Sequence, residues 1–162
     1  MNNRHFHTSQ AYDLARFYYR GFCQVTRSAA LAVAHSAYTT IAFDVTNYDL
    51  NRPNETPMHD NAVNNDRVYI RLAGVYLITA NVVWAGNKTG FRLLYLARNG
   101  ANIALDRLLP LDGADTSQQI TTQRKLSVGD YITAYVHQTS GGNLNIQQGA
   151  YSPLLSLALI GD

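Results

Sequence analysis

The sequence has a single cysteine, four prolines and no long apolar run. With Cys23 alone, the chain has no internal disulfide and no cysteine-based zinc site. No apolar stretch approaches the roughly 20 residues of a membrane span, and the N-terminus lacks the apolar core of a signal peptide. We therefore expect no membrane partner, assembly in a cytoplasm without Sec-type export, and stability that comes from packing.

Charge is scarce as well. Charged residues make up 15% of the chain, against about 25% in typical globular proteins. The first 27 residues hold Arg4, Arg16, Arg20 and Arg27 against Asp13 alone, and the remainder is nearly neutral. Such a basic arm suits an acidic partner. Because no basic stripe with interleaved aromatic residues follows it, we expect no nucleic-acid partner.

Catalytic and metal-binding motifs are also missing. The sequence has no Gly-x-Ser-x-Gly elbow, no Walker loop and no Cys-x-x-Cys. His59-Asp60 with Asp66 is the one local cluster of ligand types, but it lacks the helical spacing of a metal site, so a solvated turn is the favoured interpretation. His35 and His137 are expected on sheet faces or interfaces. The sequence thus predicts no cofactor and no enzymatic activity.

What the sequence does have is a two-residue alternation of apolar and polar residues from residue 22 onward, which is typical of β-strands. Asn99-Gly100 is the strongest hairpin signal, and Ser140–Asn143 predicts another hairpin turn. About ten strands are expected. The clear ones are residues 67–72, 75–84, 91–98, 118–126, 131–139 and 154–160, and the weaker ones are 23–27, 31–35, 39–45 and 144–147.

This pattern predicts an all-β jelly-roll β-sandwich, because no crossover helices separate the strands. The domain spans residues 22–162 and follows an N-terminal arm, residues 1–21. In the arm, Thr8 or Ser9 is placed to cap a short helix that ends at Gly21, and a frayed terminus is the alternative. Residues 49–65 are interpreted as an exposed loop, either functional or merely tolerated.

The segment Gly74–Thr79 resembles the Gly-x-Tyr-x-aromatic-Ser/Thr strand of the complement q-component globular heads and their tumour-necrosis-factor-like relatives, although aliphatic residues stand where aromatics are usual. Leu126–Ile132 resembles that family's Leu-x-Leu-x-x-Gly-Asp-x-Val hairpin. Ile41–Asp44 is similar to its early strand, and Ser152–Gly161 holds the place of its last strand but lacks the Phe-x-Gly pattern.

Asn81–Ala85 and Arg92–Gly100 look like the bacterial and tailed-phage branch of this superfamily, whose members occur as virion decorations, fibre tips and spore-surface heads. The resemblance implies a homotrimer with one sheet of each subunit turned toward the threefold axis. Strands that are apolar on both faces agree with it, since a second apolar face must be covered. We expect the trimer contact at Tyr76, Tyr95, Tyr131 and Tyr135. Alternatively, these strands are merely central to the sandwich.

The expected function is a capsid decoration protein of a tailed phage, located on the virion surface and assembled in the host cytoplasm. The major capsid protein or another virion protein is the expected partner. The arm would anchor the trimer to the shell through Arg16, Phe17, Tyr18, Tyr19 and Arg20. The alternative is a receptor- or glycan-binding head of a phage fibre or bacterial surface appendage, with Tyr48 and Trp84 as sugar-stacking rings, although a tryptophan in the position of Trp84 is more often a core residue.

Overall fold

The computed structural model describes residues 21–51, 56–110, 112–149 and 153–161. Within these ranges the chain forms twelve strands and no helix, and every strand pair is antiparallel. The prediction of an all-β chain is therefore confirmed. No helical segment of these ranges has the length and hydrophobicity that a membrane crossing requires. The predicted arm, apart from Gly21, lies outside the described residues.

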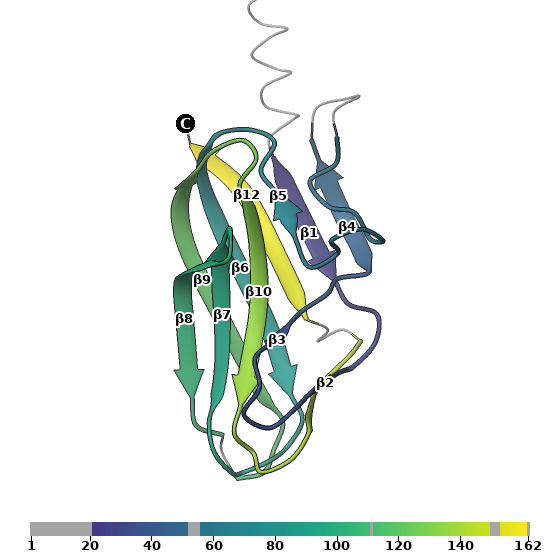
Figure 1. Ribbon diagram of the computed structural model, residues 1–162, viewed down its shortest axis with the longest axis vertical. Coiled ribbons are helices and arrows are strands. Elements are labelled where there is room, and N and C mark those ends of the chain that lie inside the picture. The colour runs from purple at the N-terminus through teal and green to yellow at the C-terminus, as the bar shows by residue number, and fades with distance from the viewer. Residues whose placement is uncertain (1–20, 52–55, 111, 150–152, 162) are drawn as a thin grey trace, which may run out of the picture.

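The strands form two layers that face each other (Figure 1). Sheet A has seven strands in the order β2 (Leu31–Val33), β11 (Leu144–Ile146), β6 (Gly74–Trp84), β12 (Leu154–Gly161), β1 (Phe22–Thr26) and β4 (Val45–Leu50), with β9 (Thr116–Leu126) paired along β6. Sheet B has five strands in the order β3 (Thr39–Thr40), β10 (Tyr131–Gln138), β7 (Arg92–Arg98) and β8 (Ala101–Leu108), with β5 (Val68–Tyr69) also paired to β10.

The connections give the sandwich its jelly-roll character. The links from β6 to β7, β8 to β9, β9 to β10 and β10 to β11 each cross from one sheet to the other. The Asn99-Gly100 hairpin between β7 and β8 is confirmed, with φ of 51° and 82° at these residues, as a two-residue turn of this kind requires. The predicted hairpin at Ser140–Asn143 is wrong, because β10 and β11 belong to different sheets.

Alternate residues of the central strands fill the space between the sheets. On β6, Tyr76, Ile78, Ala80, Val82 and Trp84 belong to this core. The core positions on the other long strands are Leu94, Leu96, Ile132, Ala134, Val136, Leu155 and Leu157. Since side chains alternate between the faces of a strand, the residues between these positions lie on the two outward faces of the sandwich.

Sequence periodicity missed two of the strands. β8 was not predicted because none of its residues is fully buried. Its side chains are either exposed or partly buried, so the strand shows no clear alternation. β4 has the same character, and it takes the first two residues of the predicted 49–65 loop. Both pair along one side only in their sheets. An edge strand buries less of its surface, which weakens the pattern on which such predictions rely.

The remainder of the predicted 49–65 loop is exposed at residues 60–64 but anchored at Met58 and His59, which are buried. The Asp49 carboxylate accepts hydrogen bonds from the backbone N–H of Met58 (2.7 Å) and of His59 (3.1 Å). The two ring nitrogens of His59 face the carbonyl oxygens of Arg67 (2.9 Å) and Phe43 (3.2 Å). The described part of this loop is therefore tied to the domain.

Candidate interaction surfaces

The four tyrosines predicted at the trimer contact do not lie together. Tyr76 has no exposed surface, and its hydroxyl donates a hydrogen bond to the carbonyl oxygen of Leu72 at 2.8 Å. Burial raises the pKa of Tyr76 to about 12. A side chain enclosed between the two sheets cannot contact another subunit, so the prediction for Tyr76 is wrong. The alternation along β6 was read correctly, but the sequence does not say which face points inward.

Tyr95, Tyr131 and Tyr135 lie on the outward face of sheet B. On β10 and β7 the core positions are those between them, which turns Tyr131, Thr133 and Tyr135 away from the sandwich. The register pairs Tyr135 with Tyr95, and Tyr131 with Tyr69 on β5. Their role in a subunit contact stays a prediction, whereas their common face is a finding.

Aromatic rings cover one half of this face. Tyr95 and Tyr135 stack with ring centroids 4.6 Å apart and an angle of 9° between their planes. Tyr38, from the segment before β3, stands edge-on against both rings at 5.8 and 5.9 Å. His137 lies 4.7 Å from the Tyr38 ring and stacks on Phe91 at 5.6 Å. Burial and a hydrogen bond with Tyr38 raise the pKa of Tyr95 to about 12.

Arginines lie over the rings at both ends of the same face. The Arg107 guanidinium is 4.3 Å from the centre of the Phe91 ring. At the other end, Arg67 lies 4.5 Å from the Tyr131 ring and Arg71 lies 5.1 Å from the Tyr69 ring. Such cation–π contacts hold the planar guanidinium against the aromatic face. The arginine–aromatic face consists of Tyr38, Arg67, Tyr69, Arg71, Phe91, Tyr95, Asn102, Arg107, Tyr131, Tyr135 and His137.

The sequence analysis missed most of this face, although a signal was available. Residues 67–71 read Arg-Val-Tyr-Ile-Arg, with the two aliphatic residues buried and the polar and aromatic ones outward. Alternation of this kind places arginine and tyrosine on one side of a strand. Tyr38 carried no such signal, because it precedes a strand of only two residues.

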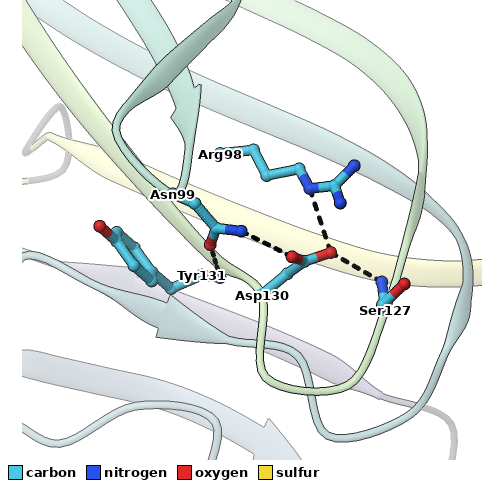
Figure 2. A network of polar contacts seen from close by, with 5 residues as sticks. All are labelled: Arg98, Asn99, Ser127, Asp130 and Tyr131. Atoms are coloured by element: carbon cyan, nitrogen blue, oxygen red, sulfur yellow. Dashed lines mark hydrogen bonds and ion pairs between the residues drawn. The ribbon is translucent and has the colours of Figure 1, made fainter.

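A buried carboxylate fixes the end of sheet B where Tyr131 begins β10. Figure 2 shows Asp130 between Arg98, Asn99 and Ser127. It accepts a hydrogen bond from the Asn99 amide at 2.7 Å and from the Ser127 N–H at 2.8 Å, and pairs with Arg98 at 3.1 Å. The side-chain oxygen of Asn99, Oδ1, in turn accepts a hydrogen bond from the backbone N–H of Tyr131 at 2.9 Å. The network therefore ties the β7–β8 hairpin to the start of β10.

Electrostatics agree with this anchoring role for Asp130. Burial by itself would raise the pKa of the carboxyl, but the hydrogen bonds from Ser127 and Asn99 and the charge of Arg98 outweigh it, so the pKa lies below its ordinary value. Hydrogen bonds donated to a carboxylate stabilise its charged form. The Gly-Asp step of the sequence motif is thus a structural device in this chain.

The outward face of sheet A has a different character. β1, β6 and β12 contain no charged residue, and on β9 the outward positions are Ser117, Gln119, Thr121, Gln123 and Lys125. The register aligns Leu50, Phe22, Ala158 and Leu77 in one row across four strands. All four side chains are at least partly exposed. Lys125 is thus the only charge among the outward strand positions that the structure describes on this sheet.

Other residues singled out by sequence have structural roles. Trp84 is fully buried and its indole N–H donates to the Gln118 side chain at 2.9 Å, so the prediction of a sugar-stacking ring is wrong there. Tyr48 is 38% exposed on β4. Asp60 accepts the N–H groups of Ala62 and Val63 in a turn. Burial raises the pKa of the Cys23 thiol.

No set of three metal-ligand side chains lies together in the described ranges. Asp66 is 3.7 Å from Arg67, while the His59 ring faces backbone carbonyl groups. The arm residues Arg16, Phe17, Tyr18, Tyr19 and Arg20 lie outside the described residues. Among the described residues, the two outward sheet faces are the candidate surfaces for a partner.

No protein-family model matches this chain, and no curated protein matches it. Solved structures do. Murine APRIL at pH 8.0 shares 15% identity at a TM-score of 0.63, covering 87% of this chain and 99% of that one. The same protein at pH 5.0 gives 14% identity and a TM-score of 0.65 with the same coverage, 87% and 99%. Eiger TNF from S. frugiperda gives 16% identity and a TM-score of 0.60, covering 88% and 94%.

At these identities the likeness establishes the fold, and the chain is a jelly roll of the tumour-necrosis-factor type. The fold expected from the sequence resemblance is confirmed. The narrower placement in a bacterial and phage branch stays a prediction.

Proposed function

We propose that the protein is a non-enzymatic homotrimer on the surface of a virion, with the outward faces of sheet A around the threefold axis. The lack of charge on that face carries the proposal. Charged residues are depleted in the buried centre of subunit interfaces, and the row of Leu50, Phe22, Ala158 and Leu77 provides apolar contact across the sheet. Closed threefold symmetry would cover these faces without open-ended growth.

This arrangement differs from the expected contact at Tyr95, Tyr131 and Tyr135. Those residues share their face with Arg67, Arg71 and Arg107. Of these three arginines only Arg67 has a carboxylate nearby, Asp66 at 3.7 Å, so burying all three in an interface would leave desolvated charges without partners. The proposal therefore assigns sheet A to the subunit contact and leaves the arginine–aromatic face turned outward.

Within this class, capsid decoration is the first candidate role. The trimer would sit on the shell of a tailed phage with its arm against the major capsid protein or another virion protein. A partner that binds only the assembled shell stabilises it by mass action. The basic and aromatic composition of Arg16, Phe17, Tyr18, Tyr19 and Arg20 supports the arm as anchor.

Deletion of residues 1–21 tests this role. The truncated chain is expected to stay trimeric and to lose binding to undecorated particles in a co-sedimentation assay. Phe17→Ala with Tyr18→Ala should nearly eliminate binding, because apolar anchors dominate interface energies. Arg16→Ala with Arg20→Ala should weaken it modestly and flatten its salt dependence. Normal occupancy by the truncated trimer would mean that the body, not the arm, docks.

A receptor- or glycan-binding head is the second candidate role, and the arginine–aromatic face favours it. Tyr38 is 65% exposed, and exposed clusters of aromatic and arginine side chains are typical of recognition surfaces. Such a head needs no shell contact. A trimer that binds host cells but not undecorated capsids would support this second role over the first.

A further inference from the structure

The arginine–aromatic face holds a buried polar atom that packing does not explain. His137 is 9% exposed, and its Nδ1 atom has no hydrogen-bond partner within the described part of the chain. The ring lies between Phe91 and Tyr38. An unpaired buried polar atom destabilises a fold, and most are satisfied by a protein group, a water or a ligand. The exposed Tyr38 ring lies 4.7 Å from the His137 ring, so a ligand held against Tyr38 would lie next to this atom.

The arginine–aromatic face carries positive groups and no carboxylate. Arg107 and Arg71 form no ion pair with any residue that the structure describes, and Arg67 has only Asp66 at 3.7 Å. Tyr131 and His137 are six positions apart along β10, so the arginines stand at the two ends of an aromatic strip about 20 Å long. The face therefore suits an elongated anionic ligand.

Most ring faces of the strip are already covered by neighbouring side chains. Tyr95 and Tyr135 stack on each other, Phe91 is stacked between His137 and Arg107, and arginines cover Tyr131 and Tyr69. Single-stranded nucleic acids need several uncovered rings on which bases can stack. A saccharide needs one open ring, which Tyr38 provides, and polar groups beside it. The Tyr135 hydroxyl and Asn102, which form a hydrogen bond with each other, are such groups on this face.

We propose that the arginine–aromatic face binds an acidic oligosaccharide. The sugar stacks on Tyr38, a sugar hydroxyl takes the free position at His137 Nδ1, and carboxylate or sulfate groups bind Arg107 at one end and Arg67 and Arg71 at the other. Guanidinium groups bind such oxyanions through paired N–H donors. The inference deepens the binding-head role and rests on that second candidate, not on capsid decoration.

Calorimetric titration of the full chain tests the proposal with four probes. A heparin hexasaccharide carries sulfate and carboxylate groups, a sialic acid hexamer carries carboxylates only, and maltohexaose is neutral. An oligothymidylate is an anion but a nucleic acid, not a saccharide. We expect binding of at least one acidic saccharide, at least tenfold weaker binding of maltohexaose and of the oligonucleotide, and affinity that falls with added salt. The two acidic probes distinguish sulfate from carboxylate recognition.

Variants locate the site. Arg107→Gln and Tyr38→Ala should each weaken binding of the acidic saccharide at least tenfold, and Arg107→Lys should restore part of the loss because it keeps the charge without the fork. Lys88→Gln removes one exposed positive charge from the β6–β7 loop, outside this face, and should leave the affinity unchanged. His137→Phe should weaken binding while keeping the thermal stability of the parent.

Three results would overturn the proposal. These are no detectable binding of either acidic saccharide, equal binding of maltohexaose or the oligonucleotide, and equal loss in Lys88→Gln and Arg107→Gln. Light scattering on the same samples reports the oligomer. A trimer that binds no saccharide defeats this inference alone, whereas a monomer defeats the proposed assembly.

Discussion

The two outward faces of the sandwich are built from strands of similar length but opposite chemistry. On sheet A the strands β1, β6 and β12 carry no charge, and small polar and aliphatic side chains alternate across the register. On sheet B, rings pack on rings and arginines lie over them. Both faces are apolar enough to look alike in a hydrophobicity pattern, so their charge is what separates them.

This difference indicates how each face meets its surroundings. The rings of sheet B largely bury one another, since Tyr95 and His137 are each 9% exposed without any partner chain. The row on sheet A has no such self-cover, and Leu50 is 49% exposed. Rings that cover one another can stay in water, whereas the partly exposed apolar row of sheet A gains more from a second subunit.

The largest effect is expected when a charge is introduced on each face, which tests which of the two faces forms the subunit contact. Leu77→Asp and Ser156→Arg, both on sheet A, should convert the trimer to a monomer, because an unpaired charge buried at a contact costs several kcal/mol. Tyr135→Asp and Leu105→Asp, on sheet B, should leave a trimer. Light scattering at micromolar concentration should give about three times 18.0 kDa for the parent and for the sheet B variants.

The opposite outcome is equally clear. If Tyr135→Asp dissociates the assembly while Ser156→Arg does not, the subunit contact lies on sheet B, as the sequence alone suggested. A parent chain that is monomeric at this concentration would remove the threefold arrangement altogether.

The sequence predicted the layered β architecture because its long central strands place apolar residues at every second position and turn signals separate them. β6, β7, β9, β10 and β12 were each located to within about two residues, the usual uncertainty of strand ends. Edge strands β4 and β8 escaped, since they lack a fully buried side. The hairpin at Asn99-Gly100 was recognisable because two adjacent positive φ angles demand such residues.

The surfaces were harder to predict than the strands. Period-two alternation divides a strand into two faces but does not say which of them enters the core, which is why Tyr76 was assigned to a surface although it is fully buried. The arginine–aromatic face joins Tyr38, Phe91 and His137 from distant segments. Only the strand register brings these rings together, and register is a property of the whole fold.

The next largest effect is expected at the anchor beneath one end of the arginine–aromatic face. Asp130→Asn should destabilise the chain by about 2–3 kcal/mol at neutral pH, since it removes charge-assisted bonds with Arg98, Asn99 and Ser127. Denaturant unfolding measures the loss. Asp112→Asn, at an exposed turn position with φ of 48° that asparagine tolerates, is the control and should change stability by less than about 0.5 kcal/mol.

The effect of Asp130→Asn should depend on pH in a defined direction. Because the folded chain holds the pKa of Asp130 below its ordinary value, the carboxylate contributes its stability above that value and loses it as the pH falls through the folded pKa. The difference between parent and variant should therefore shrink below about pH 4. A difference that is constant from pH 3 to 7 would mean that the carboxylate charge is not what ties the hairpin to β10.

The smallest effect is expected at the most exposed ring of sheet B. Tyr38 is 65% exposed while Tyr76 is fully buried, so Tyr38→Ala should cost less than about 1 kcal/mol, as surface substitutions usually do, against about 3–5 kcal/mol for Tyr76→Ala. Urea unfolding of both variants under one set of conditions gives the comparison. A small cost at Tyr38 means that the ring contributes little to folding, as the proposed sugar contact requires. If Tyr38→Ala instead costs as much as Tyr76→Ala, the Tyr38 ring is a packing residue of sheet B. The contrast between the outward faces of sheets A and B would then rest on the other residues of these faces.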